Sequence, residues 1–143
     1  MLKGISTVVA LFLLVFSTVE AQTRVAGAKA NPAQPDLSIK EFLFPPTNDK
    51  ALRVNVANSG KAGSPPSVLR LTVRKINGVA VGRTTEIKVP AIPAGKNKWV
   101  VIDAKSILPN NVALESTTFR LNADAGEKVA ESDEGNNESW HNL

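Results

Sequence analysis

The sequence predicts an all-β fold, a two-layer antiparallel β-sandwich of about seven short strands. Several stretches alternate apolar and polar residues, which is the period of a half-buried strand. Turn-forming Gly, Pro, Asn and Asp residues separate these stretches at intervals of roughly ten residues, and no stretch has a convincing helical period. Together these observations favour two sheets that enclose one aliphatic core.

The first two strands precede a long loop. Residues 37–44 form a strand with an irregular middle, and residues 45–49 have the composition of a turn. Residues 52–57 then alternate cleanly between apolar and polar side chains. A loop follows from Asn58 through the prolines at 65 and 66.

A hairpin is expected next. Residues 69–74 alternate, and Asn77-Gly78 offers positive φ at successive positions, which favours a tight hairpin turn. We expect residues 79–89 to return as the partner strand, with a bulge at Gly82.

The second half contains shorter strands. Residues 92–95 form a tight turn, and residues 99–102, 117–123 and 138–143 are strands, with a connection at 106–113. The predicted core is aliphatic and consists of Leu37, Ile39, Leu52, Val54, Val56, Leu69, Leu71, Val73, Val100, Ile102, Phe119 and Leu121.

The N-terminal residues have the features of a secretory signal peptide. Lys3 precedes an apolar run over residues 8–16, which is too short to cross a bilayer as a helix, and Val19-Glu20-Ala21 fits a cleavage site. An uncleaved anchor is the alternative. The expected organisation is a signal peptide at 1–21, a flexible tether at 22–35 and the folded domain at 36–143.

Composition limits the compartment and the partners. The net charge is +4, but lysines and arginines are scattered without a basic block, so we expect no nucleic-acid partner. The chain has no cysteine, so its single core must be stable without disulfides. After signal cleavage we expect a bacterial protein that is secreted or periplasmic and does not bind the membrane.

The segment from Asp124 to Asn137 gathers acids and amides in one predicted crossover between strands. Such side chains can bond nearby backbone amides and stabilise a turn, which is our first interpretation. Calcium is the alternative, because the segment offers oxygen ligands, although its spacing is not that of a dedicated calcium loop. The turn residues are Asp124, Gly126, Glu131, Asp133, Glu134, Asn136 and Asn137, of which Asp124, Asp133 and Asn136 are the candidate calcium ligands.

Three arginines are candidates for a basic binding face. Arg70 and Arg74 alternate with core residues and should therefore face outward, and Arg120 joins them if its strand is adjacent. A solvated sheet face is the alternative.

The two tryptophans are the other surface candidates. Trp99 faces outward if Val100 and Ile102 face inward, and it could then anchor a partner or stack on a sugar. With the opposite parity it belongs to the core. We expect Trp140 to cover the edge of the sandwich.

The residues do not favour an enzyme. Adjacent acids such as Asp133 and Glu134 point to opposite sides of an extended chain, and the single histidine, His141, lies in a terminal segment expected to fray. We therefore predict no catalytic residues and no cofactor.

Five motifs stand in a characteristic order: Pro35-Asp36-Leu37, Val54 to Gly60, the hairpin from Val73 to Gly82, Ile92-Pro93-Ala94-Gly95, and Asp124 to Asn137. In this order they resemble the CARDB module, the cell adhesion related domain found in bacteria. The resemblance extends from Asp36 to about His141. It implies an immunoglobulin-like sandwich on an exported protein, used as a spacer or interaction module and without general catalytic residues.

These observations lead to one expected function and one alternative. We expect a non-catalytic exported module of the adhesion type that binds another envelope or extracellular protein. The alternative is a small-ligand binder, with calcium at the acidic turn or carbohydrate at an exposed Trp99.

Overall fold

The computed structural model describes residues 32–45 and 50–143. The predicted signal peptide, residues 22–31 of the tether and most of the first turn lie outside these residues. Within them, no helix has both the length and the apolar character needed to cross a bilayer.

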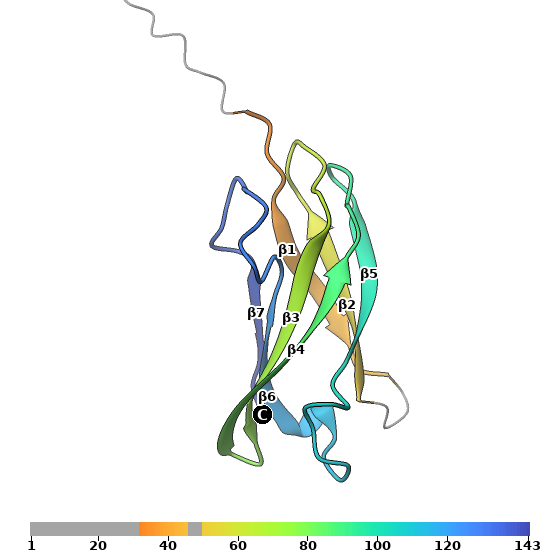
Figure 1. Ribbon diagram of the computed structural model, residues 1–143, viewed down its shortest axis with the longest axis vertical. Coiled ribbons are helices and arrows are strands. Elements are labelled where there is room, and N and C mark those ends of the chain that lie inside the picture. Colours follow the sequence, from red (N-terminus) through yellow and green to blue (C-terminus); the bar gives the residue numbers. More distant parts are fainter. Residues whose placement is uncertain (1–31, 46–49) are drawn as a thin grey trace, which may run out of the picture. The chain divides into compact units, whose positions relative to one another are not determined.

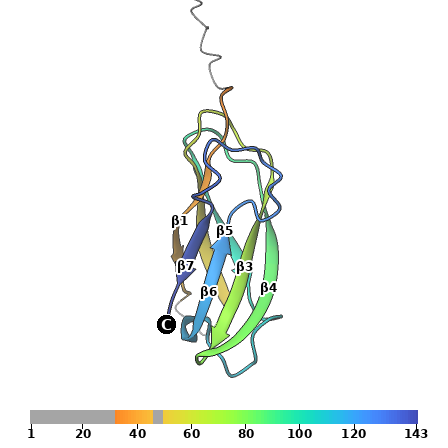
Figure 2. The ribbon, with the colours of Figure 1, turned by 90° about the vertical axis from the view of Figure 1, so that its left-hand side faces the viewer.

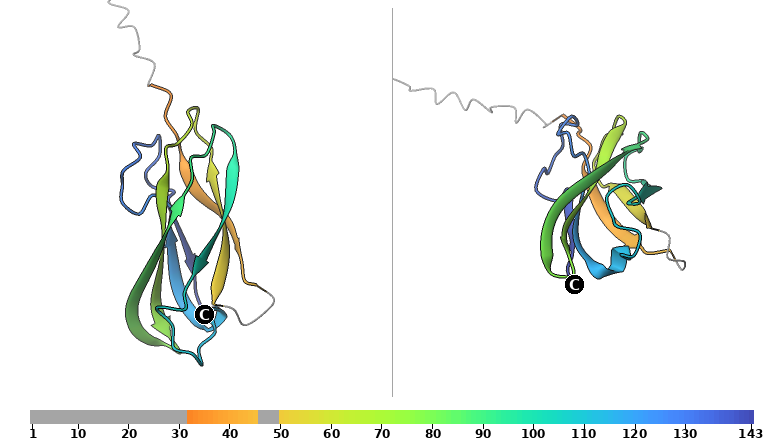
Figure 3. Two further views of the ribbon diagram at one scale, coloured as in Figure 1. Left: turned by 45° about the vertical axis from the view of Figure 1, so that its right-hand side comes forward. Right: turned by 60° about the horizontal axis from the view of Figure 1, so that its bottom comes forward.

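The described residues contain seven strands in two antiparallel sheets, which confirms the predicted all-β sandwich (Figure 1). The three-stranded sheet has the order β1-β2-β5 and the four-stranded sheet the order β4-β3-β6-β7 (Figures 2 and 3). The strands are β1 (Leu37–Leu43), β2 (Ala51–Asn58), β3 (Ser67–Ile76), β4 (Val79–Val89), β5 (Asn97–Asp103), β6 (Thr117–Asn122) and β7 (Glu138–His141).

The predicted alternation places the core between the sheets. Leu52, Val54 and Val56 of β2 are fully buried, as are the alternating apolar residues of β3 and β6. Ile39 and Val100 are partly buried and pack against this cluster. Full burial of each such side chain contributes roughly 1.5–3 kcal/mol to folding, so the aliphatic core is the main source of stability.

The β3–β4 hairpin forms as predicted. Asn77 and Gly78 have φ values of 49° and 78°, as a tight hairpin turn requires. Val73 pairs with Arg83 and Lys75 pairs with Ala80, so β4 has two residues where β3 has one. The extra residue of β4 lies at Val81-Gly82, where Gly82 has a φ of 69°.

The end of the sandwich near the β3–β4 turn contains a short 3₁₀ helix, Leu114–Ser116, that the sequence pattern did not indicate. Lys50 is buried there, and its Nζ donates to the carbonyl oxygens of Leu108 and Pro109. The side chain of Lys50 thus stabilises the connection between β5 and β6.

The prediction that the terminal segment frays at His141 was wrong. His141 lies in β7, and its ring stacks on Phe119 with 4.9 Å between centroids and an interplanar angle of 24°. Phe42 and Phe44 meet the same imidazole edge-on. This aromatic cluster attaches the last strand to the core.

Candidate functional site

The C-terminal turn bonds to the start of the domain, which lies beside it at the same end of the sandwich (Figure 1). Glu131 Oε2 accepts a 2.9 Å hydrogen bond from the backbone N–H of Leu37. Asn136 Nδ2 donates a 2.7 Å hydrogen bond to Asp36 Oδ1. Residues about a hundred positions apart are therefore joined directly.

Asn58 completes this junction, and sequence analysis did not single it out. Its buried Oδ1 accepts from the N–H groups of Asp36 and Gly60, both at 3.0 Å. Its Nδ2 donates to Ala62 O at 2.8 Å and to Ile92 O at 2.9 Å. The sequence signal that could have identified Asn58 was the Asn-x-Gly motif at the end of β2. We call Asp36, Leu37, Asn58, Glu131 and Asn136 the clasp.

Gly60 allows the chain to cross at the clasp. A Cβ atom at this position would lie 2.3 Å from Gln34 O and 2.6 Å from Asp36 N, both of which are backbone atoms. The segment before β1 therefore needs glycine beneath it.

Within the turn, the acids accept hydrogen bonds from nearby groups. Asp124 Oδ2 accepts from Val129 N at 2.8 Å, and Asp133 Oδ1 accepts from Gly135 N at 2.8 Å. The left-handed backbone positions are Asp124 and Glu127, with φ values of 47° and 48°; they do not include Gly126.

Glu134 bonds two groups of the same turn. Its Oε1 accepts from Glu131 N at 3.0 Å, and its Oε2 accepts from Asn137 Nδ2 at 3.3 Å. The side chain of Val129 is buried in the core beneath these bonds.

The carboxyl group of Glu131 has a raised pKa. Burial raises the pKa of its carboxyl to about 7, and the nearby charges of Glu134, Asp124 and Asp36 act in the same direction, while the bond from Leu37 acts against them. Its Oε1 is buried without a hydrogen-bond partner in the described part of the chain, as are the Oδ1 atoms of Asn136 and Asn137.

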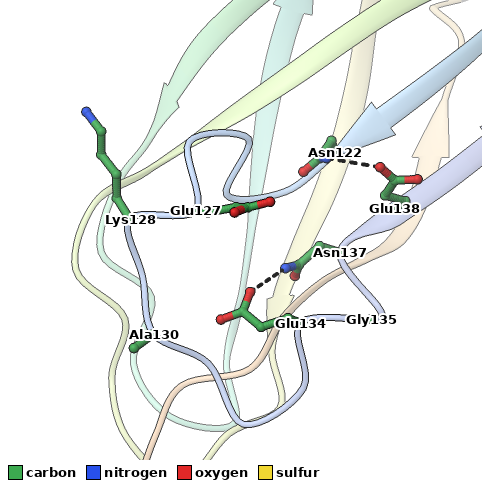
Figure 4. Close-up of a pocket in the computed structure, with 8 residues that line it drawn as sticks. All are labelled: Asn122, Glu127, Lys128, Ala130, Glu134, Gly135, Asn137 and Glu138. Carbon is green, nitrogen blue, oxygen red and sulfur yellow. Dashed lines mark hydrogen bonds between the residues drawn. The ribbon is translucent and has the colours of Figure 1, made fainter.

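A hollow of about 590 Å³ lies beside the turn (Figure 4). Glu134 and Glu138 line it, but each already accepts a hydrogen bond, from Asn137 and Asn122 respectively. Lys128 extends away from its centre in Figure 4. Across residues 32–45 and 50–143, no group of three Asp, Glu or His side chains is arranged to hold a metal ion.

The outer side of the four-stranded sheet carries two of the three predicted arginines side by side. Arg70 lies opposite Asn122, and Thr72 lies opposite Arg120, because β3 and β6 are neighbours. Arg70 pairs with Glu86 at 2.6 Å and Arg120 pairs with Glu138 at 3.0 Å. These arginine charges are therefore already compensated by acids of the same sheet.

Arg74 and Trp140 complete the description of this side. Arg74 is exposed where the β3 register shifts. Trp140 is 49% exposed and lies 5.6 Å below the guanidinium of Arg120. Trp140 thus faces outward from β7, which is the edge strand of this sheet, and that it covers the edge stays a prediction. We call Arg70, Thr72, Arg120, Asn122 and Trp140 the Trp140 face.

Trp99 lies on the other sheet, so it shares no surface with the predicted arginines. It is 36% exposed on the outer side of β5, next to Val101 at 51%. The guanidinium of Arg53 in β2 lies 5.3 Å from the centroid of its ring. The sequence left the direction of Trp99 open, and in the structure its side chain faces outward. The possible binding residues Arg70, Arg74, Arg120 and Trp99 therefore belong to two different sheets, not to one surface.

Comparison with known proteins decides the family. A model of the CARDB family matches residues 34–140. The chain belongs to the CARDB family. Two solved structures have the same fold at 21% identity. The CARDB domain of the PF1109 protein from Pyrococcus furiosus, solved in complex with di-metal ions, has a TM-score of 0.53 over 76% of this chain and 90% of that chain.

The second structure is a domain of a "putative cell surface protein" from Methanosarcina acetivorans, with a TM-score of 0.56 over 75% of this chain and 88% of that chain. No curated protein matches the chain. CARDB is a family of non-catalytic, adhesion-type domains. In this CARDB domain the turn acids and the two arginines of the Trp140 face bond to other residues of the chain, although Trp140 itself is half exposed. The Trp99 side instead gathers three exposed apolar side chains, Leu43, Trp99 and Val101.

Proposed function

We propose that this CARDB domain is a non-catalytic exported module that binds another envelope or extracellular protein. The features of residues 1–21 support export, and family membership supports an adhesion-type role. The similarity to a domain of a "putative cell surface protein" is consistent with that location.

The observation that carries the proposal is the outer side of the three-stranded sheet. Leu43, Trp99 and Val101 are 47%, 36% and 51% exposed there. Exposed apolar groups gathered on one side of a small domain are characteristic of protein-binding surfaces, and Trp is among the residues that most often dominate binding energy.

Site-specific photo-crosslinking tests this function. A photoactivatable phenylalanine analogue at Val101, in cells that naturally produce the protein, should yield a covalent adduct with another protein. The matched position is Thr84, which is exposed on β4 of the other sheet and should yield little adduct. No protein adduct from Val101, or equal adducts from both positions, would contradict the proposal.

Cation binding at the C-terminal turn is a second candidate. Three buried oxygen atoms have no partner in the described chain, namely Glu131 Oε1, Asn136 Oδ1 and Asn137 Oδ1. Carboxylate and amide oxygens are ligands that Ca²⁺ accepts, and one CARDB relative was solved with di-metal ions. Binding would raise the melting temperature in millimolar CaCl₂ relative to EDTA, and Glu131→Gln would abolish the difference. Equal melting temperatures would exclude this candidate.

A further inference from the structure

The register of the three-stranded sheet places five side chains together on its outer side. Leu43 of β1 lies opposite Arg53 of β2, and Arg53 lies opposite Val101 of β5. In the next row, Asn55 of β2 lies opposite Trp99 of β5. We call Leu43, Arg53, Asn55, Trp99 and Val101 the Trp99 face.

Arg53 lies at the centre of this apolar surface. It is exposed, and it makes no ion pair with any residue in the described ranges. Its contact with the Trp99 ring restrains the guanidinium, because a cation is attracted to the face of an indole. The planar guanidinium keeps N–H donors in a fixed fork that matches a carboxylate.

The acids on the same side of the sheet have other partners. Glu41, which lies opposite Asn55, accepts a 3.1 Å hydrogen bond from Asn55 Nδ2. Asp103 lies 3.8 Å from Lys105 Nζ and also accepts a bond from the Lys105 N–H. Arg53 is therefore a cation without a matching acid among exposed Leu, Val and Trp side chains.

This arrangement is complementary to one kind of partner. Resting on the protein-binding function proposed above, we propose that the Trp99 face docks a protein segment that presents an Asp or Glu carboxylate between apolar side chains. The carboxylate pairs with the guanidinium of Arg53 in a bidentate manner. The flanking apolar side chains cover Leu43 and Val101, and Trp99 forms the platform beneath the pair.

A selection from random peptides tests this partner chemistry. The protein is immobilised and panned against a phage-displayed library of random twelve-residue peptides, and enriched peptides are synthesised and titrated against it. Enriched sequences should carry Asp or Glu between apolar residues. Arg53→Glu should weaken their binding roughly tenfold or more, and Trp99→Ala should have a similar effect. Arg74→Glu, an exposed arginine of the other sheet, is the matched control and should leave affinity unchanged.

Four results would overturn the inference: no enrichment, enriched peptides without an acid, unchanged affinity in Arg53→Glu, or equal loss in Arg74→Glu. Binding of a glycan array that depends on Trp99 and not on Arg53 would replace the partner with a carbohydrate. The proposed protein-binding function is tested separately, and the absence of protein crosslinks from Val101 would contradict it. If those crosslinks persist in Arg53→Glu, the protein-binding function stands and the acidic partner is excluded.

Discussion

The clasp and the Trp99 face use their side chains in opposite ways. In the clasp, polar groups turn inward and bond the protein's own backbone, as Glu131 does with Leu37 and Asn58 does with Asp36. On the Trp99 face, Val101 and Trp99 turn outward, and Arg53 has no acid partner within the described residues. The clasp therefore uses its side chains to join two parts of the chain, whereas the Trp99 face leaves the Arg53 charge and its apolar neighbours available to a partner.

This difference separates stability from binding. A buried polar group that loses its partner costs free energy of folding, so substitutions that remove a hydrogen bond of the clasp should destabilise the domain. Exposed side chains away from such networks change stability little, so substitutions of Arg53 or Val101 on the Trp99 face should weaken only the binding of a partner. The two regions can therefore be tested by substitutions with opposite outcomes.

The largest effect on stability is expected for Asn58→Ala. The substitution removes two acceptor and two donor bonds in a buried site, and we expect a loss of about 3 kcal/mol in the free energy of unfolding. The melting temperature should fall by more than about 10 °C. Asn97→Ala, at an exposed position of β5, is the control and should melt like the parent protein. Equal melting of both variants would remove Asn58 from the clasp.

A smaller loss is expected for Asn136→Ala. This change removes one partly buried hydrogen bond, to Asp36, so the free energy of unfolding should fall by about 1 kcal/mol. Urea denaturation with the same Asn97→Ala control measures it. An unchanged midpoint would show that this contact does not stabilise the junction between the turn and β1.

The ionisation of Glu131 gives the clasp a dependence on pH. Its pKa in the folded protein, about 7, lies above the ordinary value of 4.5, so the folded state binds the proton more tightly than the unfolded state. Its contribution to stability is therefore full below pH 4.5 and declines as the pH rises through 7.

The variant Glu131→Gln isolates this effect. Glutamine stays neutral and can still accept the bond from Leu37, so melting temperature should rise at pH 8 and change little at pH 5. Glu127→Gln, at an exposed position of the same turn, is the control. Equal shifts at the two pH values would contradict the assignment.

The fold was predictable because its determinants are local. Leu52, Val54 and Val56 alternate with outward residues, and Asn77-Gly78 has the backbone freedom that a tight hairpin needs. The turn chemistry of Asp124 was also local, since it bonds Val129 five residues away.

The remaining features depend on long-range pairing. Residues 99–102 are all apolar, so alternation could not decide which way Trp99 points. Trp99 and Arg120 belong to different sheets because β5 pairs with β2 and β6 pairs with β3. The spacing of the strands in the sequence does not show which strands pair. The clasp bonds span 94 and 100 residues, so Glu131 and Asn136 could be recognised as turn residues but not as contacts of β1 and its approach.

The smallest effect on stability, and the sharpest test of the comparison, is expected for Val101→Ser. Val101 is 51% exposed, so the free energy of unfolding should change by less than about 0.5 kcal/mol. Affinity for the selected peptides should nevertheless fall, because Val101 supplies apolar contact beside Arg53. The matched variant is Ile102→Ser, at the next position, which is buried. It should destabilise the fold, because it places a hydroxyl group in the core. If Val101→Ser unfolded the domain, or left peptide affinity intact, the Trp99 face would be part of the scaffold and the division between the two regions would not hold.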